Sequence, residues 1–252
     1  MLQTRVFPIL LIKDGGLYKG VKFKKHKYVG DPINTVKIFN DKEVDELVII
    51  DISVTKENKE IDFDLIKQIA GEAFIPLAYG GGIRSVDDAR KLFSLGIEKV
   101  ILNTEALNNP NLINELSTEF GTQSIVFSLD VKKDFFGIQR VYSNCGTIKV
   151  KGNPIEIAVK MEKNGVGEII LNSIDREGIG AGYDLELIKN LSSKLKIPLI
   201  SQGGAGSINH MVEAKKAGAH ALAAGSYFVF QGYLRGVLIT YPSAQELKLI
   251  EL

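Results

Sequence analysis

The stretch PLAYGGGIRSVDDARKLFSLG (residues 76–96) recurs as PLISQGGAGSINHMVEAKKAG (residues 198–218), at a constant offset of 122 residues. Each copy starts as an apolar strand, passes through a glycine-rich turn and continues as an amphipathic helix. The same offset places DELVII (45–50) over GEIILN (167–172). Repetition over this distance indicates that the chain is built from two related halves.

Eight short apolar runs alternate with helical patterns such as FDLIKQIAGEA and VDDARKLFSLG, as in a parallel sheet. The runs are FPILLIKDGG (7–16), VIID (48–51), IPLAY (75–79), KVILN (99–103), IVFSLDV (125–131), EIILNS (168–173), IPLIS (197–201) and ALAAGS (221–226). Two halves of four βα units predict an α/β fold, a single (β/α)8 TIM barrel over residues 1–252. Its active site is expected at the carboxyl ends of the strands. A doubly wound sheet with an insertion is the alternative.

The composition excludes several classes of function. The 31 basic and 30 acidic residues give no strong overall field for nucleic acid or an anionic membrane, and no apolar run reaches the length of a membrane span. A cytoplasmic protein is therefore expected. Cys145 is the only cysteine and its neighbours SNCGT resemble a hairpin turn, so neither a disulfide nor a cysteine-rich metal site is expected. The three histidines lack ligand spacing, and we predict no metal or other cofactor.

Glycine-rich turns after the strands predict two sites for phosphate groups of a small molecule, related by the repeat. Exposed backbone N–H groups and a following helix start both favour an anion. The candidate residues are Gly81, Gly82, Asn103 and Thr104 in the first half, and Gly203, Gly204, Gly225 and Ser226 in the second. The alternative is that these glycines only permit tight turns. Other candidates for substrate binding at strand ends are Asp51, Asp175 and Gly178.

Asp130 ends an apolar strand, where a carboxylate is costly unless it has a purpose. It is our candidate for acid–base catalysis; the alternative is a structural carboxylate paired with Lys132 or a backbone amide. Matching LIK (11–13) with DVK (130–132) makes Leu11 its counterpart in the first half.

Several long blocks resemble the HisF family, the cyclase subunit of imidazole glycerol phosphate synthase in histidine biosynthesis. They are KDGGLYKGVKF with its loop lysine Lys19, GDP (30–32), DELVIIDI, IPLAYGGGIRS, ILNTEALNNP, SIDREGIGAGYDLEL and ISQGGAGS. The resemblance covers essentially the whole chain. It implies a glutaminase partner whose ammonia crosses the barrel to a substrate with two phosphates. It also implies two catalytic aspartates; Asp130 matches the second, whereas Leu11 stands at the first.

The chain departs from that family at the mouth of the barrel. Where the family tends to have small hydroxyl residues, this chain has Ala78, Asn172 and Gln202, all expected to face the mouth. At the opposite end of the barrel, the floor, the chain matches the family. The resemblance assigns Arg5, Glu46, Lys99 and Glu168 to a ring of alternating charges that gates ammonia, with the alternative that they only plug the floor. Glu98 lies where the family presents an acid to its glutaminase.

An altered mouth above a retained floor resembles the HisF-like proteins of WbuZ type, which are associated with bacterial surface polysaccharides. This implies a heterodimer with a HisH-like glutaminase that supplies ammonia to an ATP-dependent sugar amidotransferase. An active cyclase remains the main alternative. A HisA-type isomerase is disfavoured by Leu11, and an allosteric cap that activates a glutaminase stays open. The basic segment KFKKHKYVG (22–30) is expected to be a lid over an anionic substrate rather than a nucleic-acid patch.

Overall fold

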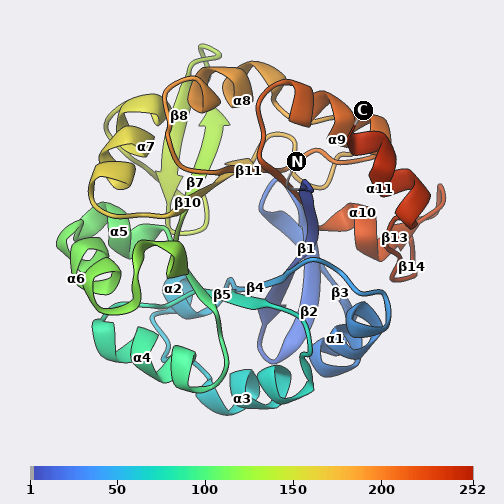
Figure 1. The fold of residues 1–252 in the computed structure, drawn as a ribbon, viewed down its shortest axis with the longest axis horizontal. Coiled ribbons are helices and arrows are strands. Elements are labelled where there is room, and N and C mark those ends of the chain that lie inside the picture. The colour runs from blue at the N-terminus through green and yellow to red at the C-terminus, as the bar shows by residue number, and fades with distance from the viewer. Residues whose placement is uncertain (1–2, 252) are drawn as a thin grey trace.

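In the computed structural model, which describes residues 3–251, eight parallel strands close into a barrel surrounded by helices (Figure 1). In order around the barrel they are β1 (Arg5–Lys13), β4 (Leu47–Asp51), β5 (Leu77–Gly80), β6 (Lys99–Leu102), β7 (Ile125–Lys133), β10 (Glu168–Ser173), β11 (Leu199–Gln202) and β12 (Ala221–Ala224). Strand β1 pairs with both β4 and β12, which closes the sheet. The predicted (β/α)8 barrel is confirmed, and a doubly wound open sheet is excluded.

Helices cover the outside of the barrel (Figure 1). The longer ones are α1 (Pro32–Asp41), α3 (Phe63–Glu72), α4 (Val86–Ser94), α6 (Asn111–Phe120), α7 (Pro154–Lys163), α8 (Leu185–Ser192), α9 (Ile208–Lys216) and α11 (Ala244–Ile250). Short helical turns α2 (Val54–Glu57), α5 (Thr104–Asn108) and α10 (Ser226–Val229) follow three of the strands, and a 3₁₀ turn spans Thr122–Ser124. Within residues 3–251, none of the helices is long and apolar enough to cross a membrane.

The repeat extends to the residues that start the helices. The Ser85 side chain accepts a hydrogen bond from the Asp88 backbone at the start of α4, and Ser207 caps α9 in the same way. Asp62 and Asp184 cap α3 and α8. Each pair of caps is 122 residues apart, so the two halves share local hydrogen bonding as well as sequence.

Three antiparallel additions decorate the barrel. The first βα loop forms a hairpin of β2 (Gly16–Val21) and β3 (Lys24–Gly30), so most of the segment expected to be a lid is a strand. A second hairpin pairs the end of β7 with β8 (Gln139–Ser143). The SNCGT segment turns from β8 into β9 (Ile148–Lys149), which confirms the predicted turn. The smallest hairpin joins β13 (Phe230–Gln231) to β14 (Gly236–Val237).

The barrel interior is a separate apolar cluster, distinct from the larger core between strands and helices. Its buried members are Phe7, Ile9, Val48, Ala78, Ile101, Val126, Ile170, Ile200, Ala221 and Ala223. These positions alternate along each strand, as expected when every second side chain faces inward. Ala78 belongs here and pairs in register with Lys99 at the lower end of the barrel. The expectation that Ala78 faces the mouth was therefore wrong, because its place along β5 is too low.

The floor, formed by the amino ends of the strands, holds a closed ring of four charges. Arg5 contacts Glu46 at 2.7 Å and Glu168 at 2.6 Å, and Lys99 contacts both carboxylates at 3.0 Å. Glu46 is almost fully buried, whereas the Arg5 side chain is 30% exposed. Each partly buried charge has two partners of opposite sign, which offsets its desolvation.

We expect Glu46→Gln to lower the free energy of unfolding by about 3 kcal/mol, because two cations then share the single remaining carboxylate of Glu168. Urea titrations measure this change. The double variant Glu46→Gln, Lys99→Met removes one charge of each sign and should recover part of the loss. Equal destabilisation by the single and double variants would contradict the coupling of these four side chains.

Candidate functional site

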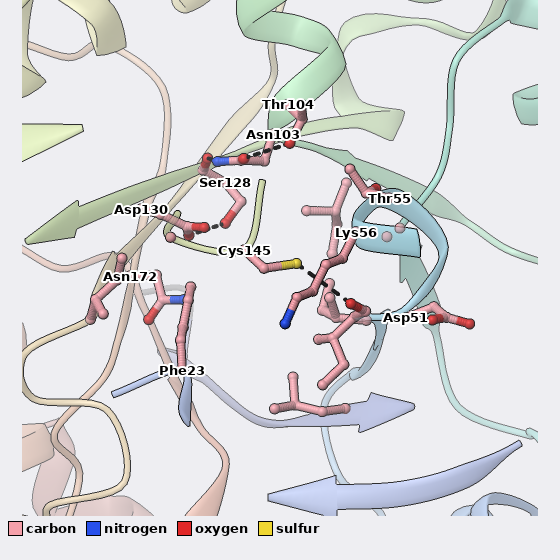
Figure 2. A pocket seen from close by; sticks show the side chains of 18 of the residues that line it. Phe23, Asp51, Thr55, Lys56, Asn103, Thr104, Ser128, Asp130, Cys145 and Asn172 are labelled. Carbon is pink, nitrogen blue, oxygen red and sulfur yellow. Dashed lines mark hydrogen bonds between the residues drawn. The ribbon is translucent and has the colours of Figure 1, made fainter. Parts of the chain in front are cut away.

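A cavity of about 360 Å³ opens at the mouth, formed by the carboxyl ends of the strands. Its walls come from both halves of the barrel and from the first hairpin (Figure 2). Asp130 and Asn172 lie on one side, and Asp51 and Lys56 on the other (Figure 2). Of the predicted residues it brings together Leu11, Asp51, Gly81, Gly82, Asn103, Thr104, Asp130, Asn172 and Gln202.

At two of the repeat-related positions only glycine fits, because any side chain would collide with a neighbouring backbone. A side chain at Gly81, where φ is +119°, would collide with the Asp51 carbonyl, and one at Gly203, where φ is +87°, would meet the Ser173 carbonyl. Asp51 and Ser173 are themselves 122 residues apart. These contacts agree with the alternative interpretation, in which the glycines permit tight turns. It does not conflict with anion binding, because the same close approach also brings backbone N–H groups to the surface.

The first-half cradle (Gly81, Gly82, Asn103 and Thr104) opens into the cavity. The Gly82 N–H donates to Thr55 at 3.1 Å, and the Asn103 amide donates to the Ser128 carbonyl at 2.8 Å. The Thr104 hydroxyl accepts from the Asn144 backbone at 2.9 Å. Lys56 from α2, which the sequence reasoning missed, extends its amine toward the centre of the cavity (Figure 2). An anion here would thus meet a cation and a helix start.

The second-half cradle (Gly203, Gly204, Gly225 and Ser226) lies outside the cavity lining. Buried Lys19 reaches it: its ammonium donates to the Ile9 carbonyl and would contact a side chain at Gly225. Burial lowers the pKa of Lys19 to about 8, against the opposing effect of Glu177. The Ser226 hydroxyl oxygen is buried without a hydrogen-bond partner. A buried ammonium beside an unsatisfied hydroxyl suits an anion.

Asp130, at the end of β7, is 7% exposed. Burial raises its pKa to about 7, while hydrogen bonds from Ser128 and Asn172 oppose this increase and nearby Glu177 adds to it. The Ser128 hydroxyl donates to Asp130 at 3.0 Å (Figure 2). A carboxyl group with this pKa can give or take a proton near neutral pH, as acid–base chemistry requires.

Leu11 lines the same cavity as Asp130, on the wall formed by β1 and β4. Its register partner Ile50 also lines the cavity. The first half of the mouth is thus apolar at this level, while the second half presents Asp130, Asn172 and Gln202. The apolar wall offers no group that can exchange a proton.

A second buried carboxyl group in the cavity wall, besides Asp130, was missed by sequence reasoning. Glu177 is 6% exposed, and burial raises its pKa while Lys19 opposes the increase. The sequence reasoning chose its neighbours Asp175 and Gly178 instead. Asp175 accepts from the Lys133 backbone N–H at 2.7 Å and lies at a smaller, separate cavity. Gly178 packs closely against the Gly20 carbonyl of β2. The only feature of the sequence that could have pointed to Glu177 is its place in SIDREGIG, the segment that also contains Asp175 and Gly178.

Asp51 and Cys145 also line the cavity. Asp51 accepts hydrogen bonds from the Ser53 backbone at 2.9 Å and the Ser53 hydroxyl at 2.7 Å, which holds the turn into α2. Burial raises the pKa of the Cys145 thiol to about 11, so it is a weak nucleophile at neutral pH. Within residues 3–251, no cluster of three or more His, Cys, Asp or Glu side chains could hold a metal ion.

Comparison with known proteins shows which family the chain belongs to. The family model described as "Histidine biosynthesis protein" matches residues 5–234. The "Putative imidazole glycerol phosphate synthase subunit hisF2" of Pseudomonas aeruginosa is 50% identical, covering 98% of this chain and 99% of the relative. The chain belongs to the HisF family.

Two further HisF relatives span nearly the same range. The "Putative imidazole glycerol phosphate synthase subunit hisF3" of Vibrio vulnificus is 45% identical over 98% of this chain and 96% of its own length. The "Imidazole glycerol phosphate synthase subunit HisF" of Exiguobacterium sibiricum is 40% identical over 90% and 91%. The resemblance drawn from the motifs is confirmed at the level of the family.

We expect Asp130→Asn to stabilise the protein at pH 8 by on the order of a few kcal/mol and to have little effect near pH 4. The folded-state pKa of Asp130 is raised, so the folded state binds more protons and stability falls as pH rises from about 4 to about 7. A tenfold difference in acid dissociation constant between the folded and unfolded states corresponds to about 1.4 kcal/mol. Denaturant titrations at both pH values measure the difference. A variant less stable than the parent at pH 8 would show that the charged form is favoured in the folded protein, contrary to this geometry.

Proposed function

We propose that this HisF-family barrel receives ammonia from a HisH-like glutaminase and delivers it for amidation of a sugar of a bacterial surface polysaccharide. The observation that carries this proposal is the contrast between the ends of the barrel. Leu11 forms an apolar wall opposite Asp130, whereas the four-charge ring at the floor is intact. On this proposal the cyclase chemistry has been lost and transport of ammonia has been kept.

The barrel interior supports a conduit. The side chains between the ring and the cavity are apolar, from Phe7 and Ile9 to Ile170 and Ile200. Neutral ammonia tolerates such a path better than an ion does, because burying a charge without a partner is costly. The ring would then exclude or neutralise ions at entry while its pairs rearrange to admit ammonia.

The relatives fit a paralogue. The relatives at 50% and 45% identity carry the numbered names hisF2 and hisF3, while the Exiguobacterium HisF is 40% identical. The partners proposed on this basis are a HisH-like glutaminase at the floor, as a heterodimer, and an ATP-dependent sugar amidotransferase that consumes the ammonia. Exposed Glu98, which directly precedes the ring residue Lys99, would lie in the glutaminase interface.

The proposal predicts that the barrel is needed for amidation driven by glutamine but not for amidation driven by ammonium salts. Mixing the barrel, a HisH-like glutaminase and the ATP-dependent amidotransferase allows both rates to be measured. Glu98→Lys should lower the glutamine-driven rate at least tenfold, because a reversed charge at an interface opposes docking. The ammonium-driven rate should not change.

Glu115→Lys is the matched control, because Glu115 is exposed on α6 and belongs neither to the four-charge ring nor to the cavity lining. It should leave both rates at the parental level. A glutamine-driven rate that persists without the barrel would exclude the proposed role.

An active cyclase of histidine biosynthesis is the second candidate. It is favoured by the raised pKa values of Asp130 and Glu177, since two carboxyl groups with such values can divide acid and base roles. The open first-half cradle and Lys19 at the second would then hold the two phosphates of the substrate.

We expect no turnover of the phosphoribulosyl substrate by the parent protein in excess ammonium, and a measurable rate for Leu11→Asp. Loss of one acid–base group typically costs about 10²- to 10⁴-fold in rate, which restoring it should partly recover. Leu11→Asn, similar in size but unable to exchange a proton, should remain inactive. Turnover by the parent would instead establish an active cyclase.

A further inference from the structure

We propose that the second-half side of the mouth contains a binding site for the ammonium ion, formed by the Asp130 carboxylate and the Asn172 side-chain oxygen. The inference deepens the proposed function and rests on it, because the ligand is the cargo that the function requires. Its basis is a buried acceptor without a donor, placed beside a buried carboxyl group at the upper end of the apolar interior.

The strand register brings these groups into one row. Asn172 on β10 pairs with Asp130 on β7 and with Gln202 on β11. All three line the cavity. Two residues below Asn172 on the same strand is Ile170, a member of the apolar interior. A molecule that leaves the apolar interior at Ile170 therefore meets Ser128, the register partner of Ile170, and then this row.

Asn172 supplies the observation that points to a ligand. It is 5% exposed, and its side-chain oxygen is buried without a hydrogen-bond partner. Asn172 also favours the charged form of Asp130 by hydrogen bonding, which opposes the raised pKa of that carboxyl group. A buried acceptor left without a donor typically costs about 1–3 kcal/mol. A ligand that donates a hydrogen bond would remove that cost.

Asp130 has no ion-pair partner among the described residues, although Lys56 extends its amine toward the cavity centre from the opposite side (Figure 2). Among residues 3–251, none of the ion pairs includes Asp130 or Glu177. Two of the nearby lysines are directed elsewhere: Lys132 lies over the Tyr142 ring, and Lys19 donates to the Ile9 carbonyl. A water molecule would satisfy the Asn172 oxygen but not the charge. Ammonium satisfies both, since its four N–H groups can bond to several acceptors at once.

The proton balance is simple. Ammonia that arrives neutral takes the proton of the Asp130 carboxylic acid, which gives ammonium beside a carboxylate. The reverse transfer regenerates ammonia as the nucleophile for the acceptor. Burial raises the pKa of Asp130 to about 7, so both directions are accessible near neutral pH.

The test uses the purified barrel alone. Its thermal unfolding is measured at pH 7.5 in ammonium chloride and in potassium chloride at equal ionic strength, together with direct NMR titration of ¹⁵N-labelled ammonium. Ammonium should raise the melting temperature in a saturable way, because it binds only the folded state. Potassium, which donates no hydrogen bonds, should give a smaller increase. Equal effects of the two salts would overturn the proposal.

Two variants locate the site. Asn172→Leu removes the acceptor and Asp130→Asn removes the charge, and each should weaken ammonium binding at least tenfold. Asn190→Leu makes the same substitution on the exposed face of α8 and should bind like the parent. If Asn172→Leu does not fold, Asp130→Asn carries the test. Unchanged binding in Asp130→Asn would overturn the site.

The outcomes separate this inference from the proposed function. Absence of ammonium binding with a normal glutamine-driven amidation rate would remove the site and leave the conduit. Binding without glutamine-driven amidation would leave the site and remove the conduit.

Discussion

The arrangement of the whole molecule depends on the alternation of side chains in a closed parallel barrel. Because β1 pairs with both β4 and β12, no strand of the barrel has a free edge, and every second residue must face the axis. Inward positions therefore stack in levels. Charges occupy the floor, apolar side chains the middle, and Leu11, Ile50, Asp130, Asn172 and Gln202 the mouth. A change at one inward position alters one level and leaves the others intact.

That separation explains how the two ends of the barrel can differ in their likeness to the family. The ring at the floor needs only Arg5, Glu46, Lys99 and Glu168, each held by a strand start. The mouth has lost the symmetry that the backbone retains. Gly81 and Gly203 have the same steric constraint in the two halves. Yet the first half offers Leu11 and Ile50 where the second offers Asp130 and Asn172.

Sequence patterns were sufficient for the fold because repetition and alternation are local properties. The offset of 122 residues predicted the paired strands and glycine turns, and the helix caps follow it too. Sequence could not decide which acid of SIDREGIG enters the cavity. That depends on a loop conformation set by contacts with the first hairpin, such as the Lys22 N–H bond to the Glu177 carbonyl at 3.0 Å. Likewise Ala78 was placed too high, because a motif gives the strand but not the level of a residue along the barrel axis.

The substitution at Leu11 has a physical consequence beyond the loss of a proton donor. A carboxylate at position 11 of β1 would face the same cavity as Asp130 and Glu177. Like charges in a buried space raise one another's pKa values. With leucine there, no further acid is added beside Asp130 and Glu177, and the nearby ammonium of Lys19 lowers the pKa of Glu177 against the larger effect of burial. Asp130 is then the carboxyl group that neutral ammonia from the apolar interior would meet and that could protonate it. Leucine at position 11 thus leaves Asp130 and the unsatisfied oxygen of Asn172 opposite an apolar wall formed by Leu11 and Ile50.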